Sequence, residues 1–276
     1  MTSADPVAAH YARGGLLARL DAALRADGVD PAHPGIEGLA PYDQFHGRGI
    51  EATEELADLM PARAADRVLD LGSGIGGPAR YVATRHGCRV TGIDLTLEFG
   101  DVARDLTRRL DLQDRVDFVT GDALAMPFPD ASFDGAYSMN VSMNIAGKDA
   151  LYREIHRVLE PGGWLLLSEL AQGEGGEVEY PTPWAMSAET RFLSTAQQTR
   201  QGLEEAGYEI VRFDSSLSQA LDFAARSRAL VESGGKPPHR AVMLIHGELA
   251  AAAMRNTSRG LNAGRIVPIE VLARRR

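Results

Sequence analysis

Cysteine is almost absent from this chain of 276 residues, which contains Cys88 alone. A single thiol cannot form a disulfide within the chain, nor can it supply the cysteine ligands of a zinc cluster. It lies in the apolar stretch CRVTGIDL, which is typical of a buried thiol in a strand. We therefore expect neither a disulfide framework nor a metal site.

Long apolar runs are lacking as well. No run approaches the roughly 20 residues that a membrane span requires. The first residues, MTSADPVAAHYARGG, lack the basic region and apolar core of a signal peptide. These features predict a soluble cytoplasmic protein without a membrane partner.

Positive charge is in deficit, with 29 Lys and Arg against 38 Asp and Glu and a formal net charge of −9. Proteins that bind nucleic acids usually present a basic surface. We therefore expect a small-molecule partner and no nucleic acid, and we interpret the terminal Arg274-Arg275-Arg276 as a solvated tail.

Hydrophobic periodicity divides the chain near residue 60. Before it, LLARLDAALRADG predicts a helix ending at Gly28, and EATEELADLM predicts a short helix stopped by Pro61. The intervening DPAHPGIEGLAPYDQFHGRG, rich in Pro and Gly, predicts a loop. Residues 1–60 are thus expected to form an N-terminal helical cap or lid.

From residue 61 onward, short apolar strands alternate with helices. The predicted strands are RVLDLG, CRVTGIDL, VDFVTGD, FDGAYSMN and WLLLSEL, separated by helices such as GPARYVATRHG, FGDVARDLTRRLDL and KDALYREIHRVLEPGG. This order is typical of an α/β domain with a mostly parallel sheet and helices on both faces. AQQTRQGLEEAG, YEIVRFDSS and GRIVPIEVLARR add a helix and two strands, leaving insertions at about 171–195 and 217–263.

The stretch VLDLGSGIGGPARYVA, residues 68–83, places a glycine-rich turn between a strand and a helix. Such a turn lets a ligand approach the backbone and the free N–H groups of the helix. The spacing Gly72-x-Gly74-x-x-Gly77 in this turn matches the pattern of dinucleotide-binding loops. Asp70, however, would repel a pyrophosphate and attract an ammonium group. A ligand with both carboxylate and ammonium, such as the methionine half of S-adenosylmethionine, suits this loop.

Two further acids end the next two strands. Asp94 lies where an acid receives ribose hydroxyls, a feature shared with NAD proteins. Asp122, followed by Ala123, can read the exocyclic amine of adenine, although alone it is equally a turn or cap residue. Acids at the ends of three successive strands favour a nucleoside ligand.

DLGSGIGGPARYVA, GIDLT, GDALAMPFPDASFD and RVLEPGG together resemble the successive motifs of class I S-adenosylmethionine-dependent methyltransferases, over residues 40–215. The flanks DQFHGRGIEATEELA, MNI-x-x-K-x-x-LY-x-E and PTPWA are similar to the branch of sarcosine/dimethylglycine-type enzymes, which adjoins phospho-base, tocopherol and sterol methyltransferases. The resemblance implies a Rossmann-like sheet with an antiparallel last strand, S-adenosylmethionine as cofactor, and direct in-line methyl transfer.

The resemblance also implies how each part of the cofactor is held. Asp70 binds the ammonium, the glycine loop lets the backbone approach the ligand, Asp94 binds the ribose, and Asp122 with Ala123 binds the adenine. Asn140 contacts the methionyl part, and a segment with Tyr42 and Gln44 folds over the cofactor. These candidates are Asp70, Gly72, Ser73, Gly74, Gly76, Asp94, Leu95, Asp122, Ala123, Asn140, Tyr42 and Gln44.

We expect the acceptor pocket at the ends of the fourth and fifth strands and in the insertions. Its candidates are Met143, Asn144, Trp184, Arg191 and Phe192. The aromatic face of Trp184 suits a methylated ammonium by cation–π attraction, and it equally suits packing of the loop.

Two residues are candidate catalytic groups. Glu169 ends the fifth strand, where an acid can orient or deprotonate a nucleophile, or brace the loop by hydrogen bonds. Relatives carry a histidine after the fourth strand where this chain has Asn140, and His46 in the lid is the nearest substitute. The missing histidine favours a nitrogen or sulfur nucleophile over an alcohol.

The sequence thus predicts a methyltransferase acting on a small molecule, with an amine or amino acid as the leading acceptor. The alternatives are O- or C-methylation of a natural product, quinone or terpenoid; an NAD-dependent dehydrogenase; and a cofactor-binding subunit without catalysis. The insertion at 217–263 is apolar enough to roof a pocket or to pack in a homodimer. Its Arg255-Asn256 motif and Asn262 suit carboxylate binding or surface capping.

Overall fold

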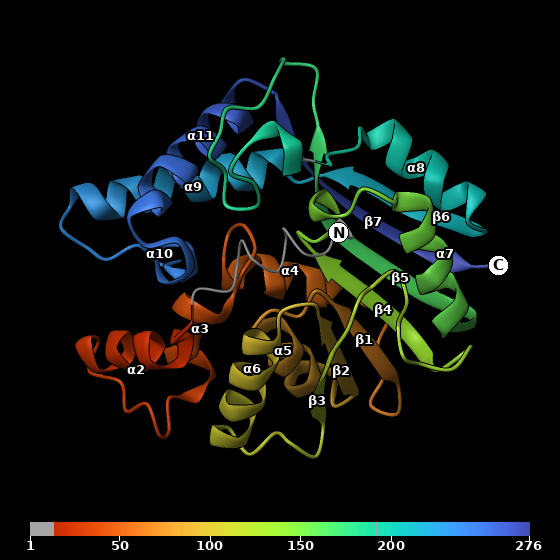
Figure 1. The fold of residues 1–276 in the computed structure, drawn as a ribbon, viewed down its shortest axis with the longest axis horizontal. Coiled ribbons are helices and arrows are strands. Elements are labelled where there is room, and N and C mark those ends of the chain that lie inside the picture. Colours follow the sequence, from red (N-terminus) through yellow and green to blue (C-terminus); the bar gives the residue numbers. More distant parts are fainter. Residues whose placement is uncertain (1–13, 191) are drawn as a thin grey trace.

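A computed structural model describes residues 14–190 and 192–276. Its centre is a seven-stranded sheet with the order β3-β2-β1-β4-β5-β7-β6 (Figure 1). The strands are β1 Arg67–Leu71, β2 Arg89–Asp94, β3 Val116–Thr120, β4 Phe133–Met139, β5 Leu159–Gln172, β6 Tyr208–Ser215 and β7 Ile266–Arg275. Strands β1 to β5 pair in parallel, whereas β7 runs antiparallel to both β5 and β6. The predicted Rossmann-like sheet with an antiparallel last strand is confirmed.

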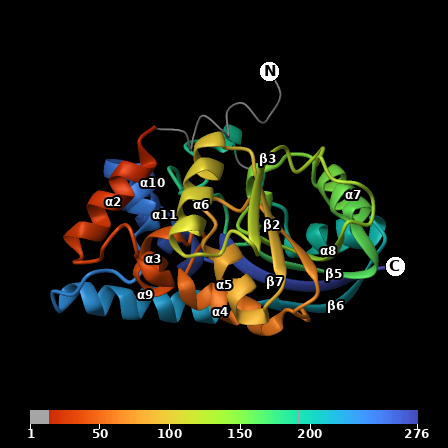
Figure 2. The same cartoon turned by 90° about the horizontal axis from the view of Figure 1, so that it is seen from below.

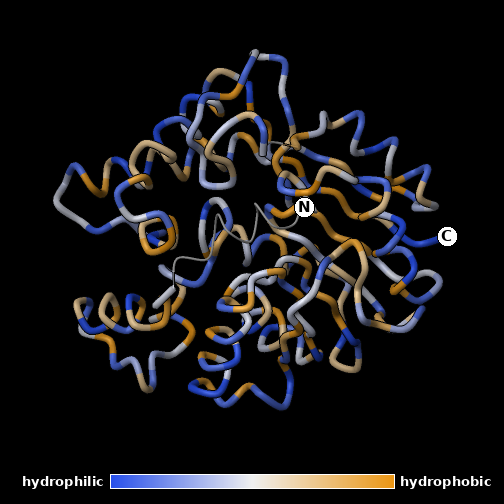
Figure 3. The backbone as a smooth tube through the Cα atoms, in the orientation of Figure 1, coloured by the Kyte–Doolittle hydropathy of each residue, from blue (hydrophilic) through white to orange (hydrophobic). Residues whose placement is uncertain are grey.

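Helices cover both faces of this sheet (Figure 2). They are α4 Ile50–Leu59, α5 Gly77–His86 and α6 Leu97–Arg109 on one face, and α7 Lys148–Val158 and α8 Ala196–Glu205 on the other. Hydrophobic residues concentrate along the central strands (Figure 3), because a parallel sheet with both faces covered is buried on both sides. Cys88 lies in this core, as expected for a structural thiol.

The Pro- and Gly-rich stretch before residue 50 does not form only a loop, as its composition predicts. It contains α3, Gly35–Asp43, which packs beside α2, Leu16–Ala26. Leu39 and Tyr42 share a buried cluster with Leu20 and Leu24. The burial of this apolar face outweighs the low helix propensity of Pro41, so the prediction is wrong over α3.

The boundary between α7 and β5 also differs from the prediction. Helix α7 ends at Val158, and β5 begins at Leu159, so the Glu160–Gly163 turn belongs to the strand and not to the helix. Pro161 explains this end, because proline disfavours helical conformation at the residue before it.

The insertion before β7 is helical, as predicted, and comprises α9 Leu217–Glu232, α10 Ala241–His246, the short η3 Gly247–Leu249 and α11 Ala250–Asn262. Figure 1 shows α9 and α11 side by side above the strand ends, with α10 next to the α2–α3 cap. Two more short 3-10 helices, η1 Ser142–Asn144 and η2 Ala188–Thr190, follow β4 and β5. Among the helices of residues 14–190 and 192–276, none has the length and apolar character of a membrane span.

Candidate active site

Two adjoining cavities lie at the carboxyl ends of the parallel strands. The smaller has a volume of about 150 Å³ and is lined by the glycine loop and the ends of β2, β3 and β4. The larger has a volume of about 610 Å³ and lies between the β5 end, the α3–α4 segment and the insertion. Phe45, His46 and Asn140 line both cavities, so a molecule in one cavity can meet a molecule in the other at these three residues.

The glycine loop joins β1 to α5 in a conformation that only glycine adopts easily. Gly72 has φ of 64°, and a Cβ there would lie 2.4 Å from Val141 Cγ2. Its N–H and that of Ser73 donate hydrogen bonds to the Ile93 carbonyl at 2.8 and 3.1 Å. Gly74 has φ of 53° and donates its N–H to Asp94 Oδ2 at 2.9 Å. Both positive φ values and the close contact at Gly72 require glycine.

Asp70 is a deeply buried acid of the smaller cavity. Its side chain is 2% exposed and adjoins the Tyr137 hydroxyl, but within the described part of the chain its Oδ2 makes no hydrogen bond of good geometry, and neither does the buried Ser73 Oγ. Burial raises the pKa of Asp70 to about 8. Buried polar atoms are normally paired, so these two atoms are suited to a ligand. An ammonium group would stabilise the Asp70 carboxylate, and the Ser73 hydroxyl can donate to a carboxylate.

Asp94 and Asp122 line the same cavity from the next two strand ends. Asp94 accepts N–H bonds from Gly74 and from Thr96 at 2.8 Å, while burial raises its pKa. Asp122 Oδ1 accepts the Leu124 N–H at 2.9 Å, which is the turn role that the sequence left open. Leu95 and Ala123 line the cavity beside these acids. The predicted acids of the three strands are therefore brought together around one cavity.

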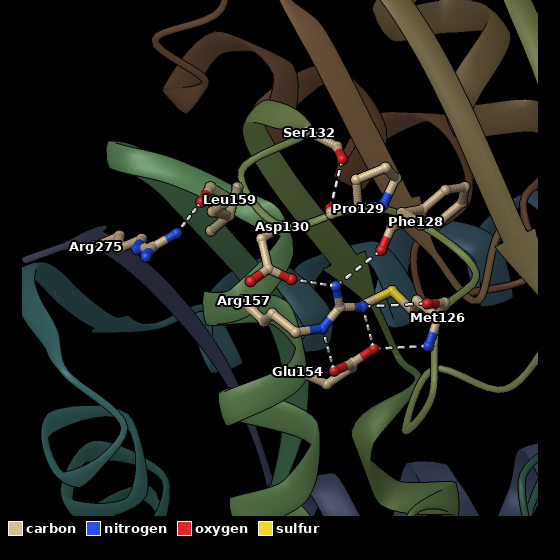
Figure 4. Close-up of polar contacts among 9 residues, drawn as sticks. All are labelled: Met126, Phe128, Pro129, Asp130, Ser132, Glu154, Arg157, Leu159 and Arg275. Atoms are coloured by element: carbon tan, nitrogen blue, oxygen red, sulfur yellow. Dashed lines mark hydrogen bonds and ion pairs between the residues drawn. The ribbon is translucent and has the colours of Figure 1, made fainter.

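The loop that carries Asp122 is fixed by Arg157 of α7 (Figure 4). The guanidinium donates to the Phe128 and Met126 carbonyls at 2.8 and 3.1 Å and pairs with Glu154 at 2.7 Å. Glu154 Oε1 in turn accepts the Met126 N–H at 2.7 Å. This network explains why the turn after β3 holds one shape although it is irregular.

Several predicted cofactor residues do not line the smaller cavity. A Cβ on Gly76 would lie 2.3 Å from Phe118 Cζ, so this glycine allows helix–sheet packing. Tyr42 donates to Asp27 Oδ2 at 2.7 Å, and Gln44 bonds Asp43 and Thr53. Tyr42 and Gln44 therefore hold the cap segment that presents Phe45 to both cavities.

The predicted acceptor residues separate into three places. Met143 and Trp184 line the larger cavity, whereas Asn144 lines the smaller one. Phe192 lines neither, and its carbonyl accepts a hydrogen bond from Lys148 Nζ at 2.6 Å. Arg191 lies outside the described residues.

Glu169 and His46 are both buried in hydrogen-bond networks. Glu169 accepts from the Ser138 hydroxyl, from both the N–H and the hydroxyl of Ser142 at 3.0 and 2.9 Å, and from the Val141 N–H at 3.0 Å. His46 Nδ1 faces the Gly47 carbonyl at 3.0 Å, Nε2 lies 3.0 Å from the Thr53 hydroxyl, and burial lowers the His46 pKa to about 3. The geometry of Glu169 supports the bracing role, and His46 is a poor proton acceptor.

A histidine of the insertion was not foreseen. His239 lines the larger cavity and places Nε2 2.7 Å from the Gln44 carbonyl, so Nε2 carries the proton and Nδ1 keeps its lone pair. Burial lowers the pKa of His239 and so favours the neutral ring. No sequence signal indicated this contact, because the two residues are 195 positions apart.

Comparison with known proteins identifies residues 69–167 as a match to the methyltransferase domain. A 24-methylenesterol C-methyltransferase of Oryza sativa subsp. japonica is 43% identical over 180 residues, which are 63% of this chain and 50% of that protein. A phosphoethanolamine N-methyltransferase of Triticum aestivum is 30% identical over 203 residues, covering 71% and 40%. The chain thus spans half or less of the length of these two relatives.

Solved structures share the fold over most of the chain. A geranyl diphosphate C-methyltransferase of Streptomyces coelicolor has a TM-score of 0.72 at 17% identity and covers 100% of this chain and 99% of that one. The [4+2]-cyclase SpnF has a TM-score of 0.64 at 25% identity, covering 95% and 94%. A sarcosine dimethylglycine methyltransferase-like protein of Galdieria sulphuraria has a TM-score of 0.64 at 19% identity, covering 82% and 85%. Residues 69–167 thus match a methyltransferase domain, and the sheet and glycine loop of the chain have the fold of these solved structures, several of which are methyltransferases.

Proposed function

We propose that this protein transfers the methyl group of S-adenosylmethionine to a mainly apolar small molecule larger than an amino acid, on oxygen or carbon. The observation that carries the proposal is the cavity of about 610 Å³ that adjoins the smaller cavity at Phe45, His46 and Asn140. Volumes of roughly 300–1,000 Å³ are typical of sites for drug-sized ligands.

The charges around the larger cavity argue against a purely cationic amine as acceptor. Its charged lining residues, within the described chain, are Arg48, Arg228, Arg255, Arg259 and Glu169. The one carboxylate among them, Glu169, already accepts hydrogen bonds at both oxygens. An acceptor that carries only positive charge would therefore lack a counter-charge and would be repelled by Arg228 and Arg255.

In the smaller cavity we assign the ammonium of the cofactor to Asp70, its carboxylate to the Ser73 hydroxyl, its ribose to Asp94, and its adenine to Asp122 and Ala123. The unpartnered atoms of Asp70 and Ser73 support this assignment. The cofactor supplies a sulfonium-bound methyl group that a nucleophile can attack directly. The remaining task of the protein is to hold the nucleophile in line and to exclude water.

Asn140 is proposed to align the two ligands, since it lines both cavities and has φ of 57°, a conformation uncommon for residues other than glycine. For a hydroxyl acceptor, an oxygen lone pair forms the new bond to the methyl carbon, and the electrons of the broken C–S bond stay on sulfur. The hydroxyl proton passes to solvent, and His239 Nδ1 is proposed only to accept a hydrogen bond from that hydroxyl, because burial lowers the pKa of His239 as it lowers that of His46.

The test is an assay for S-adenosylhomocysteine release with two sets of acceptors. One set holds glycine, sarcosine, dimethylglycine and ethanolamine phosphate; the other holds phenols, quinols, prenyl alcohols and macrolide alcohols. We expect turnover only in the second set. Turnover confined to the amines would overturn the acceptor class, and binding of S-adenosylhomocysteine without turnover in either set would contradict the transferase.

A further inference from the structure

The wall of the larger cavity formed by the insertion carries arginines that the proposed transfer does not use. Arg228 on α9 and Arg255 on α11 line the cavity and are exposed, so they lie where it opens to solvent. The two helices run side by side (Figure 1). The amides of Asn256 and Asn262, noted in the sequence, donate to the Pro181 and Ser258 carbonyls, so Asn256 ties α11 to the loop of Pro181 and Asn262 bonds within the last turn of α11.

The other two arginines of the cavity have acidic partners. Arg48 pairs with Glu55 at 2.7 Å and lies 3.5 Å from Glu270, while Arg259 pairs at 3.3 Å with Glu179, which it shares with Arg265. Within residues 14–190 and 192–276, neither Arg228 nor Arg255 forms an ion pair. Their two uncompensated guanidinium groups leave positive charge at the opening of the cavity that can attract an anion, although the chain has a net charge of −9.

Deeper in the cavity the wall is apolar. Trp184, which is 5% exposed, lies in a buried cluster with Met143, and Ala241 and Ile245 of α10 are buried. The buried atoms Trp184 Nε1 and Ser227 Oγ have no hydrogen-bond partner within the described residues. A buried indole N–H without a partner is costly, so its position on a cavity wall indicates a ligand oxygen nearby.

We propose that the larger cavity binds an amphipathic anion, with its apolar body against the Trp184 wall and its carboxylate or phosphate group held by Arg228 and Arg255. The inference rests on the proposed function, because it names the class of acceptor that this cavity receives. An elongated acid or phosphate ester with an oxygen along its chain satisfies the apolar wall, the free donors and the two guanidinium groups together.

The test is calorimetric titration of the full chain, saturated with S-adenosylhomocysteine, with four probes of equal chain length: dodecanoate, dodecyl phosphate, dodecan-1-ol and dodecylammonium. We expect the two anions to bind roughly tenfold or more tightly than the alcohol, and the ammonium to bind most weakly. The stronger of the two anions identifies the head group. Equal affinities for all four probes, a preference for the ammonium, or no binding would overturn the proposal.

The preference must also depend on the two arginines. The double variant Arg228→Gln/Arg255→Gln is expected to bind dodecanoate no better than dodecan-1-ol. Arg226→Gln, which removes the same charge from the same helix but from a residue paired with Glu51 at 2.7 Å, is expected to keep the preference. Thermal melting of each variant controls for folding, and an anion preference that survives in the double variant would refute the site.

Failure of this proposal is distinguishable from failure of the proposed function. Preferential binding of anions without any methyl transfer would support the arginine site and refute the proposed transferase. Methyl transfer to neutral apolar acceptors without preferential binding of anions would support the transferase and refute the arginine site.

Discussion

Glu169, within β5 and paired there with Ile269 of β7, accepts two hydrogen bonds from Ser142 of η1, one from the backbone N–H at 3.0 Å and one from the hydroxyl at 2.9 Å. With the additional bonds from Ser138 and Val141, this carboxylate fixes the turn that carries Asn140. We propose that it positions Asn140 between the two cavities, because both of its oxygens are engaged in hydrogen bonds to that turn, while burial raises its pKa.

Glu169→Gln tests this positioning role. The amide nitrogen of Gln cannot accept the bonds that one carboxylate oxygen receives, so we expect a loss of about 1–3 kcal/mol in the free energy of unfolding in urea. Glu160→Gln on the same strand removes an exposed partner of Arg67 and should cost less than about 1 kcal/mol. Unchanged stability of the Glu169 variant together with loss of a pH-dependent step in turnover would instead restore it as a base.

The raised pKa of Asp70 makes cofactor binding depend on pH. The free carboxyl has a pKa of about 8 and is mostly protonated at pH 7, whereas a bound ammonium lowers that pKa. Binding of S-adenosylhomocysteine near pH 7 should therefore release a proton, and its affinity should rise between about pH 6 and 8. Calorimetry in buffers of different ionisation enthalpy measures the release.

Asp70→Asn should abolish this proton release and weaken binding by about 10–100-fold. The folding stability of the ligand-free protein also depends on pH through Asp70. Because the folded pKa exceeds the unfolded value of 3.8, the neutral form stabilises the fold at low pH, and this contribution is lost as the pH rises through about 8. Proton release that persists in the Asn variant would show that another group titrates.

Gly72→Ala tests the close packing of the glycine loop against Val141. The added Cβ would lie 2.4 Å from Val141 Cγ2 at a residue with φ of 64°, so both a clash and backbone strain are expected. Gly162→Ala is a matched control, because Gly162 has φ of 78° with no atom within 4 Å of the added Cβ. The control should cost about 1–2 kcal/mol, and Gly72→Ala distinctly more. Equal losses in the free energy of unfolding for the two variants would show that the loop shifts to accommodate the added methyl group.

Arg80 and Asp43 form an ion pair of 3.0 Å in the interior, with side chains 1% and 3% exposed. The pair joins α5 to α3 and so holds the segment that presents Phe45 to both cavities. Arg80→Met leaves an uncompensated buried carboxylate, and we expect a loss of about 3–5 kcal/mol in urea unfolding.

Arg85→Met is the matched control for that prediction. It breaks an exposed pair with Asp58 at 3.2 Å on the same helix and should cost about 0–1 kcal/mol. If Asp43→Asn in the Arg80→Met background restores no stability, the cost does not come from the unpaired charge.

The strand–helix alternation after residue 61 could be predicted from the sequence because each buried strand of a parallel sheet is a short apolar run. The three acids could be located as well, since strand ends of a parallel sheet meet at one edge. The helix α3 could not, because only tertiary burial of Leu39 and Tyr42 stabilises it. Bracing of a loop by Glu169 was one of the two roles that the sequence suggested, but its partners in the turn after β4 and the contact of His239 with Gln44 depend on residues distant in the sequence, which no local pattern predicts.

The most direct test of the account is calorimetric binding of S-adenosylhomocysteine and NADH to the same preparation. An ammonium group would draw the proton off Asp70 and pair with the resulting carboxylate, whereas a pyrophosphate offers this carboxyl no opposite charge. We predict that S-adenosylhomocysteine binds and that NADH neither binds measurably nor displaces it. Tighter binding of NADH, with unchanged affinities in Asp70→Ala, would contradict the assignment of the smaller cavity.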